Sequence, residues 1–136
     1  MHTLVLYGHS ARAEARLREM ARLAREHGDR LTVLALAPQE PQTFPVKCDT
    51  RRVLWNQILR DLAHEDLTRA YIALDGNDEV ELDVLQCPGR HPADALAAEA
   101  RTRRADEIVL ADPSYSGLRR WERRRLRRRS PVPVSG

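Results

Sequence analysis

Few side chains in this sequence have the types and positions that catalysis requires. His9 and Ser10 follow the apolar run 3–7, and Cys87 and His91 stand on either side of Gly89. Imidazole, hydroxyl and thiol groups can act as bases, nucleophiles or metal ligands only when they are held at defined spacing. The sequence contains no Ser-His-Asp order, HExxH, Walker loop, GxGxxG or CxxC pair. We therefore expect no catalytic residue, no metal site and no enzyme activity.

A second group of residues could hold a phosphate through backbone N–H groups. It follows the apolar run 108–110 and contains Ser114, Ser116 and Gly117, with two arginines shortly after. Small residues before a helix let backbone N–H groups face an anion. Asp112 opposes this use because a carboxylate repels phosphate, and a turn-capping role is its ordinary interpretation. The predicted remnant of a nucleotide or phosphate site comprises Gly8, His9, Ser10, Gly89, Ala111, Ser114, Ser116, Gly117, Arg119 and Arg120.

Arginine dominates the region that follows. Residues 119–129 carry a local charge of +7, which leaves −4 for the rest of a chain whose net charge is +3. If residues 117–129 form a helix, Leu118, Trp121 and Leu126 share a stripe that docks, and the arginines face solvent. Most such charge runs are solvated faces. The alternative is a salt-sensitive, poorly sequence-selective surface for nucleic acid or another polyanion, formed by Arg123, Arg124, Arg127 and Arg128.

The elements that position these residues begin as a strand, a helix and a strand. Residues 3–7 and 31–36 are continuous apolar runs typical of strands covered on both faces, and the helix between them starts after Ser10 and stops at Gly28. A proline-rich loop at about 38–50, expected to be mobile, precedes a second amphipathic helix that contains Leu54, Ile58, Leu59 and Leu62.

The second half of the sequence continues the alternation. Residues 80–85 are the third strand, whereas residues 70–74 either continue the second helix or form a hairpin strand before Asp75-Gly76. A helix over 93–104 and a short strand at 108–110 follow, and residues 131–135 read as an edge strand because of their prolines. The whole pattern predicts parallel strands joined by helices.

The order Gly-x-His-Pro-Ala-x-x-Leu, helix, Ala-Asp-x-Ile-Val, loop, Gly-Leu-Arg-Arg, helix, Pro-Val-Pro-Val resembles the universal stress protein family. The resemblance covers the chain and is strongest from Gly89 to Val134. It implies one α/β domain over residues 1–136, a three-layer α/β/α sandwich of the adenine-nucleotide alpha-hydrolase-like type with a five-stranded parallel sheet in the order 3-2-1-4-5. It also implies a homodimer formed through the last strand, with Val132, Pro133 and Val134 at the interface.

The sequence departs from the pattern by which members of that family bind ATP. Those members carry an aspartate after the first strand and Gly-x2-Gly-x9-Gly-Ser/Thr after the fourth. Here Gly8 stands at the position of the aspartate, Ala111 replaces the first glycine, and arginines replace the closing pair. The resemblance therefore implies the branch without the ATP loop. We expect no cofactor, and the alternative is a protein that binds ATP or AMP in a remodelled crevice.

Resemblance and composition together predict a regulatory or protective stress-response protein that acts by binding a partner. The expected partners are a second copy of the chain, another protein or a polyanion. No signal peptide or long apolar segment is evident, and Cys48 and Cys87 lie far apart without CxxC spacing. These features predict a reducing cytoplasm, two free thiols and no membrane insertion, and a disulfide between the two cysteines is the alternative. Arginine outnumbers lysine 22 to 1. This ratio is typical of GC-rich genomes or thermophiles, and we expect a bacterial source.

Overall fold

The computed structural model of the 136-residue chain describes residues 1–39, 50–77, 79–88 and 91–136. Strands and helices alternate along the chain until the end, where a 3-10 turn precedes the last helix. The elements are β1 (His2–Leu6), α1 (Ala11–His27), β2 (Arg30–Gln39), α2 (Thr50–Ala73), β3 (Glu81–Pro88), α3 (Pro92–Thr102), β4 (Glu107–Leu110), η1 (Pro113–Tyr115), α4 (Arg120–Arg129) and β5 (Val134–Ser135).

The strands form one parallel sheet in the order β3-β2-β1-β4-β5. Its central strand, β1, aligns Val5 with Val33 of β2 and Leu4 with Ile108 of β4. The sheet order and the α/β class predicted from the sequence are therefore confirmed. Because the order reverses direction on either side of β1, the carboxyl ends of β1 and β4 border the place where open parallel sheets bind ligands.

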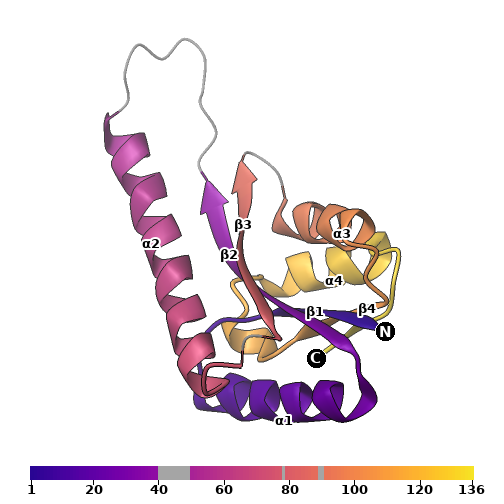
Figure 1. The fold of residues 1–136 in the computed structure, drawn as a ribbon. Helices are drawn as coiled ribbons and strands as arrows, with labels where there is room; N and C mark the ends of the chain where they lie inside the picture. Colours follow the sequence, from indigo (N-terminus) through magenta and orange to yellow (C-terminus); the bar gives the residue numbers. More distant parts are fainter. Residues whose placement is uncertain (40–49, 78, 89–90) are drawn as a thin grey trace.

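Helices cover both faces of the sheet (Figure 1). Alternate residues of each central strand point to opposite faces, so Val5 packs with Leu17 of α1 and Leu67 of α2 in one core cluster. Leu4 packs in the other cluster with Leu96 of α3, and Leu126 of α4 belongs to that cluster as well. These two clusters form the layers of an α/β/α sandwich.

The structure confirms the predicted ends of α1 and settles the alternatives for residues 70–74. Ser10 caps α1 by accepting a hydrogen bond from the N–H of Ala13 at 3.0 Å, and Gly28 ends it with a left-handed φ of 68°. α2 continues to Ala73, so residues 70–74 are not a hairpin strand. Ala70 and Leu74 are buried in register with Leu67 at helical spacing, and this burial outweighs the local turn signal.

Two predicted boundaries at the end of the chain are wrong. The arginine-rich helix starts at Arg120 rather than at residue 117, because Gly117 has a left-handed φ of 85° that a helix cannot contain. The last strand spans Val134–Ser135 rather than 131–135. Ser130 bends the chain before it, since its Oγ donates to the carbonyl of Val132 at 2.6 Å.

The proline-rich loop predicted at about 38–50 lies largely outside the described residues, and β2 runs through Pro38 to Gln39. Within the described ranges, no helix is sufficiently long and apolar to cross a membrane.

Candidate functional site

At the carboxyl ends of β1 and β4, the segment that follows β4 folds back onto Gly8. The backbone of Gly8 is buried, and a Cβ atom built on it would lie 1.5 Å from the carbonyl oxygen of Tyr115 and 2.7 Å from the carbonyl carbon. Backbone atoms cannot swing aside as a flexible side chain can. No residue with a side chain, and therefore no aspartate, fits after β1 while η1 holds this position.

A carboxylate of the chain binds the donors that the sequence offered to a phosphate. Asp112 is 5% exposed, and its Oδ2 accepts from Ser10 Oγ at 2.8 Å while its Oδ1 accepts from the N–H of Ser114 at 3.1 Å. The predicted turn-capping role of Asp112 is confirmed, because this carboxylate caps η1. Ser10 and Ser114 lie close together, as predicted, but they bind the Asp112 carboxylate of the chain itself.

The rest of the segment is closed by its own side chains. Ser116 Oγ donates to the carbonyl of Pro113 at 3.1 Å and accepts from the N–H of Leu118 at 3.3 Å. Arg123 Nη1 donates to the carbonyls of Pro113 and Leu118, each at 2.9 Å. Arg123, predicted from the sequence to face a polyanion, therefore holds the loop in place instead.

A second buried carboxylate lies where α4 meets the start of α3. Glu122 is 3% exposed, its Oε2 accepts from the N–H of Ala93 at 3.0 Å, and its Oε1 lies 3.0 Å from His91 Nδ1. The N–H groups of a helix start lack partners within the helix and favour negative charge. Glu122 thus supplies from α4 the cap that His91, the N-cap residue of α3, does not provide with its own side chain.

This arrangement corrects the predicted docking stripe of α4. Trp121 is 51% exposed and does not dock, whereas Leu118 and Leu126 are buried as expected. Glu122 takes the inward position because it lies four residues before Leu126 and meets the α3 N–H groups there. The sequence signal that could have revealed Glu122 is its position as the single acid within the arginine run, in helical register with Leu126.

The histidines at the strand ends do not form one group. The Nδ1 atom of His9 lies 3.0 Å from the Tyr7 hydroxyl, whereas His91 contacts Glu122 and, edge-on, the ring of Trp121. Burial, with the nearby charge of Glu14, raises the pKa of Tyr7 to about 12, and burial also raises the pKa of Asp66.

The thiol of Cys87 is likewise unsuited to nucleophilic chemistry. Cys87 is 2% exposed, and burial, assisted by the charge of Glu122, raises its pKa to about 12. A thiol with this pKa stays protonated at neutral pH and is a poor nucleophile. Among the described residues, no group of three or more His, Cys, Asp or Glu side chains could hold a metal ion.

The remaining predicted site residues are dispersed. Ala111 is buried in the core, Arg120 is exposed, and Gly89 lies outside the described residues. Arg119 borders a different hollow of about 440 Å³, between the end of β2 and the starts of α3 and α4. The hollow is lined by Pro38, His91, Pro92, Gly117, Arg119, Trp121 and Glu122.

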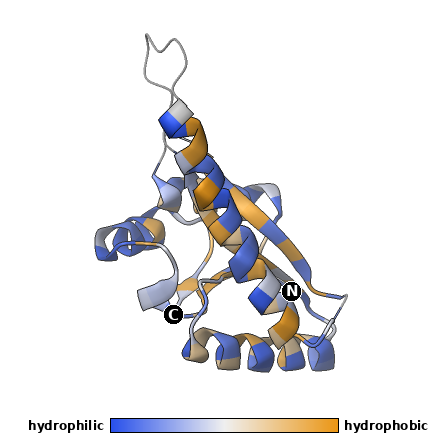
Figure 2. Cartoon of the chain, turned by 90° about the vertical axis from the view of Figure 1, so that its left-hand side faces the viewer, coloured by the Kyte–Doolittle hydropathy of each residue, from blue (hydrophilic) through white to orange (hydrophobic). Residues whose placement is uncertain are grey.

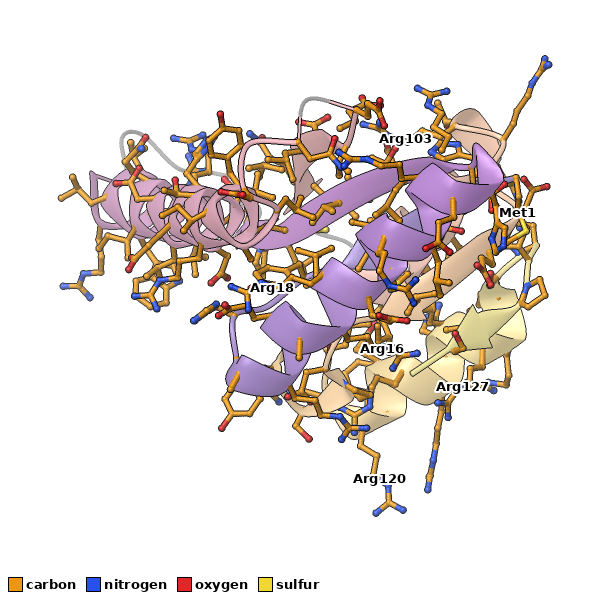
Figure 3. All side chains as sticks on the ribbon, turned by 60° about the horizontal axis from the view of Figure 1, so that its bottom comes forward. Met1, Arg16, Arg18, Arg103, Arg120 and Arg127 are labelled. Carbon is orange, nitrogen blue, oxygen red and sulfur yellow. The ribbon has the colours of Figure 1, made fainter. Side chains whose placement is uncertain are left out.

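The outer surface of α4 presents the other three arginines predicted to bind a polyanion. Arg124, Arg127 and Arg128 line an open hollow of about 560 Å³ together with Trp121. Arg120 extends away from the body of the molecule (Figure 3), whereas Arg127 Nη2 donates to the carbonyl of Gly136 at 3.5 Å. An exposed indole beside guanidinium groups offers both a stacking surface and positive charge.

The residues predicted for the dimer interface lie at the edge of the sheet. Val132 and Val134 are partly buried against the core cluster beneath α3 and α4. Pro133 is exposed, and its carbonyl accepts from the N–H of Ile108 of β4 at 2.9 Å. The two valines therefore contribute their side chains to the chain's own core, and the free edge of β5 is only two residues long.

Comparison with known proteins shows which proteins share this architecture. No protein-family model matches the chain, and no curated protein matches it significantly. A universal stress protein family structure from Burkholderia pseudomallei is 18% identical with a TM-score of 0.69, covering 98% of this chain and 92% of that one. A universal stress protein from Archaeoglobus fulgidus in complex with dAMP is 21% identical with a TM-score of 0.65, covering 98% and 94%.

A more distant example is the universal stress protein family protein from Arabidopsis thaliana with AMP bound. It is 12% identical with a TM-score of 0.56, and the match covers 99% of this chain and 90% of that one. Near-complete coverage in each case means that the likeness extends over the whole α/β domain. The chain has the fold of the universal stress proteins.

Proposed function

We propose that this chain is a universal stress protein-like regulatory or protective protein of the bacterial cytoplasm that acts by binding a partner protein, as a homodimer. It has no enzyme activity in this proposal, and it lacks the ATP site of its nucleotide-binding relatives. The shared fold supports the family assignment, and the motif from Gly89 to Val134 adds to it. A shared fold does not by itself carry nucleotide binding, which must be judged from the site.

The observation that carries the proposal is the closed end of β1. The Tyr115 carbonyl occupies the space that a side chain at position 8 would need, and the Asp112 carboxylate already bonds Ser10 Oγ and the Ser114 N–H. A triphosphate there would have to displace a buried carboxylate from two hydrogen bonds and would meet its negative charge. Two solved structures of this fold hold dAMP and AMP, whereas this chain departs from the ATP-binding pattern of the family at Gly8 and Ala111.

Isothermal titration of the purified chain with ATP and AMP tests the proposal. We expect no heat of binding at millimolar nucleotide, and no ultraviolet-absorbing nucleotide released when the protein is denatured. Micromolar binding would contradict the proposal and favour a remodelled crevice. In that case Arg119→Gln should weaken binding, because Arg119 borders the hollow beside Trp121, whereas Arg25→Gln at the far end of α1 should not.

A second candidate function is polyanion binding through α4, and the exposure of Trp121 favours it. The indole lies among Arg124, Arg127 and Arg128 rather than in the core. Stacking of bases on an aromatic ring and release of counterions by arginines are the two terms that bind single-stranded nucleic acid.

Salt-dependent retention on heparin, followed by titration with single-stranded DNA, tests this candidate. Replacing Arg124, Arg127 and Arg128 with Gln should make the salt dependence shallower: the magnitude of the negative slope of log affinity against log salt should decrease by about 2. Replacing Arg12, Arg25 and Arg104 with Gln makes the same change in net charge elsewhere on the surface and should have a smaller effect. Equal losses from both triple variants would mean that α4 is only one part of a diffuse basic surface.

A further inference from the structure

α2 carries an apolar face on the side that points away from the sheet. Its inward side buries Ala63 and Leu67, yet Leu54, Ile58 and Leu62 are 59%, 48% and 52% exposed. Hydrophobic residues recur along the side of α2 that faces the viewer in Figure 2, and none of the other helices and strands that the structure describes covers that side in Figure 1. Single exposed apolar side chains are common, but a row of them on one helix marks a contact surface.

The row is bounded by charges of opposite sign. Arg51, Leu54, Ile58, Leu62 and Glu65 follow one another at steps of three and four residues, so on a helix they fall within a stripe about 80° wide. All five are exposed. The stripe thus reads basic, apolar, apolar, apolar, acidic along a segment about 21 Å long.

This pattern is complementary to itself when it is reversed. If two α2 helices lie antiparallel about a two-fold axis at Ile58, Leu54 of each copy faces Leu62 of the other, and Arg51 faces Glu65 twice. A two-fold interface needs such self-complementarity, because each contact occurs in both directions. A parallel pairing would instead place each Arg51 against its own equivalent. We propose that the outer face of α2, from Arg51 to Glu65, binds the same face of a second copy of this chain in antiparallel orientation.

Among the described residues, the helix next to α2 leaves the paired segment uncovered. α1 meets α2 near its carboxyl end, where Arg18 Nε donates to the carbonyl of Ala73 at 3.2 Å. The paired segment lies in the other part of α2, away from α1 (Figure 1). Glu65 also pairs with Arg69 in its own helix at 3.2 Å, an exposed contact that an approaching arginine can share.

The inference rests on the homodimer of the proposed function and gives it a surface other than the edge of β5. A monomeric chain would refute the homodimer of both proposals, but it could still bind a different protein and still lack an ATP site, so the rest of the proposed function is tested separately. Conversely, micromolar ATP binding would overturn the functional proposal without affecting the oligomeric state.

Sedimentation equilibrium of the full chain across about 1–100 μM, a range that brackets the affinity of weak dimers, tests the pairing. The wild-type chain should dimerise. Ile58→Glu places two carboxylates against each other at the two-fold axis and should raise the dissociation constant at least ~100-fold. The matched control is Ile72→Glu, because Ile72 is 69% exposed on the same helix but lies outside the segment 51–65. This control should leave the dissociation constant unchanged.

A charge exchange then tests the orientation. Arg51→Glu should weaken the dimer about tenfold, since it faces Glu65 of the second copy, and Arg51→Glu combined with Glu65→Arg should restore it. Circular dichroism tests whether each variant folds. If Ile58→Glu does not fold, the double variant Leu54→Gln with Leu62→Gln replaces it and should also raise the dissociation constant. A wild-type chain that is monomeric at about 100 μM would overturn the proposal and leave the face to another protein. A dimer that survives Ile58→Glu would also overturn it and direct attention to β5.

Discussion

The crevice at the end of β1 and the outer face of α2 differ in whether their side chains already have partners within the chain. In the crevice, the buried carboxylate of Asp112 bonds to donors of the same chain, and beside the neighbouring hollow the buried carboxylate of Glu122 does the same at the start of α3. On α2, Leu54, Ile58 and Leu62 remain exposed and meet no core. A surface whose groups are already satisfied has little to gain from a ligand, whereas an exposed apolar row gains by being covered. The contrast favours recognition through the surface over ligand binding in the crevice.

The chemistry of the two carboxylates explains why the crevice stays closed. A buried carboxylate is costly unless donors are oriented toward it, and both Asp112 and Glu122 sit at the starts of helical segments, where N–H groups lack intrahelical partners. Hydrogen bonds of this kind to an ionised group are stronger than neutral ones. The chain thus supplies, from within, the negative charge that a phosphate would bring to these positions.

Placing a side chain at Gly8 should break the closed crevice and gives the largest expected effect. Gly8→Ala forces the Tyr115 backbone away from β1, and we expect the free energy of unfolding, measured in urea, to fall by about 3 kcal/mol. Gly28→Ala is the matched control. No atom lies within 4 Å of a Cβ there, so that change should cost only the strain of a left-handed φ, about 1 kcal/mol.

Equal losses from the two glycine variants would mean that η1 moves aside easily. The crevice would then be able to open, and the contrast with α2 would lose its basis. Titration of the Gly8→Ala variant with AMP would be the next measurement in that case.

Removing the buried carboxylate of α4 should have an intermediate effect. Glu122→Ala leaves the N–H of Ala93 buried without its acceptor, which should lower the free energy of unfolding by about 2 kcal/mol. Glu122→Gln keeps one carbonyl oxygen as an acceptor and should cost less. Glu26→Ala, an exposed pair partner of Arg22, is the control and should change stability little. A Glu122→Ala loss no larger than that control would show that the carboxylate does not hold α3 and α4 together.

The sequence predicts the fold well because its signals are local. The apolar runs in β1 and β2, the Ser10 cap and the Gly28 stop each act within a few residues, and the order of motifs after Gly89 fixes the sheet order by resemblance. Trp121 is exposed and Glu122 is buried, which is the reverse of the expectation from the sequence, and the reason is not local. The N–H groups of α3 that attract Glu122 lie about thirty positions earlier in the chain, where helical periodicity has no influence.

The candidate site shows the same limit. The sequence identifies Gly8 as a departure from the ATP-binding pattern, but it does not reveal that the Tyr115 backbone occupies the space, because that contact joins two distant loops. It also places Ser10 and Ser114 near a phosphate and Asp112 as an obstacle. Only the structure shows that the obstacle is itself bound to both serines. Close packing between loops is a property of the folded chain and has no local sequence signature.

The smallest expected effect is that of Leu62→Ala on the outer face of α2. It is best compared with a change of Leu67, a leucine of the same helix that lies on the opposite face. Leu67 is 8% exposed and packs on the sheet, so Leu67→Ala should lower the free energy of unfolding by about 3 kcal/mol. Leu62 is 52% exposed, and Leu62→Ala should cost about 0.5 kcal/mol or less when the chain is dilute.

Concentration decides what the Leu62 result means. Because a dimer stabilises the folded state by mass action, the wild-type Tm should rise with protein concentration, and Leu62→Ala should reduce that rise without lowering the dilute value. Leu67→Ala should lower the Tm equally at all concentrations. If Leu62→Ala were as costly as Leu67→Ala in dilute solution, the outer face of α2 would be part of the chain's own core, and both the contrast with the crevice and the proposed pairing would fail.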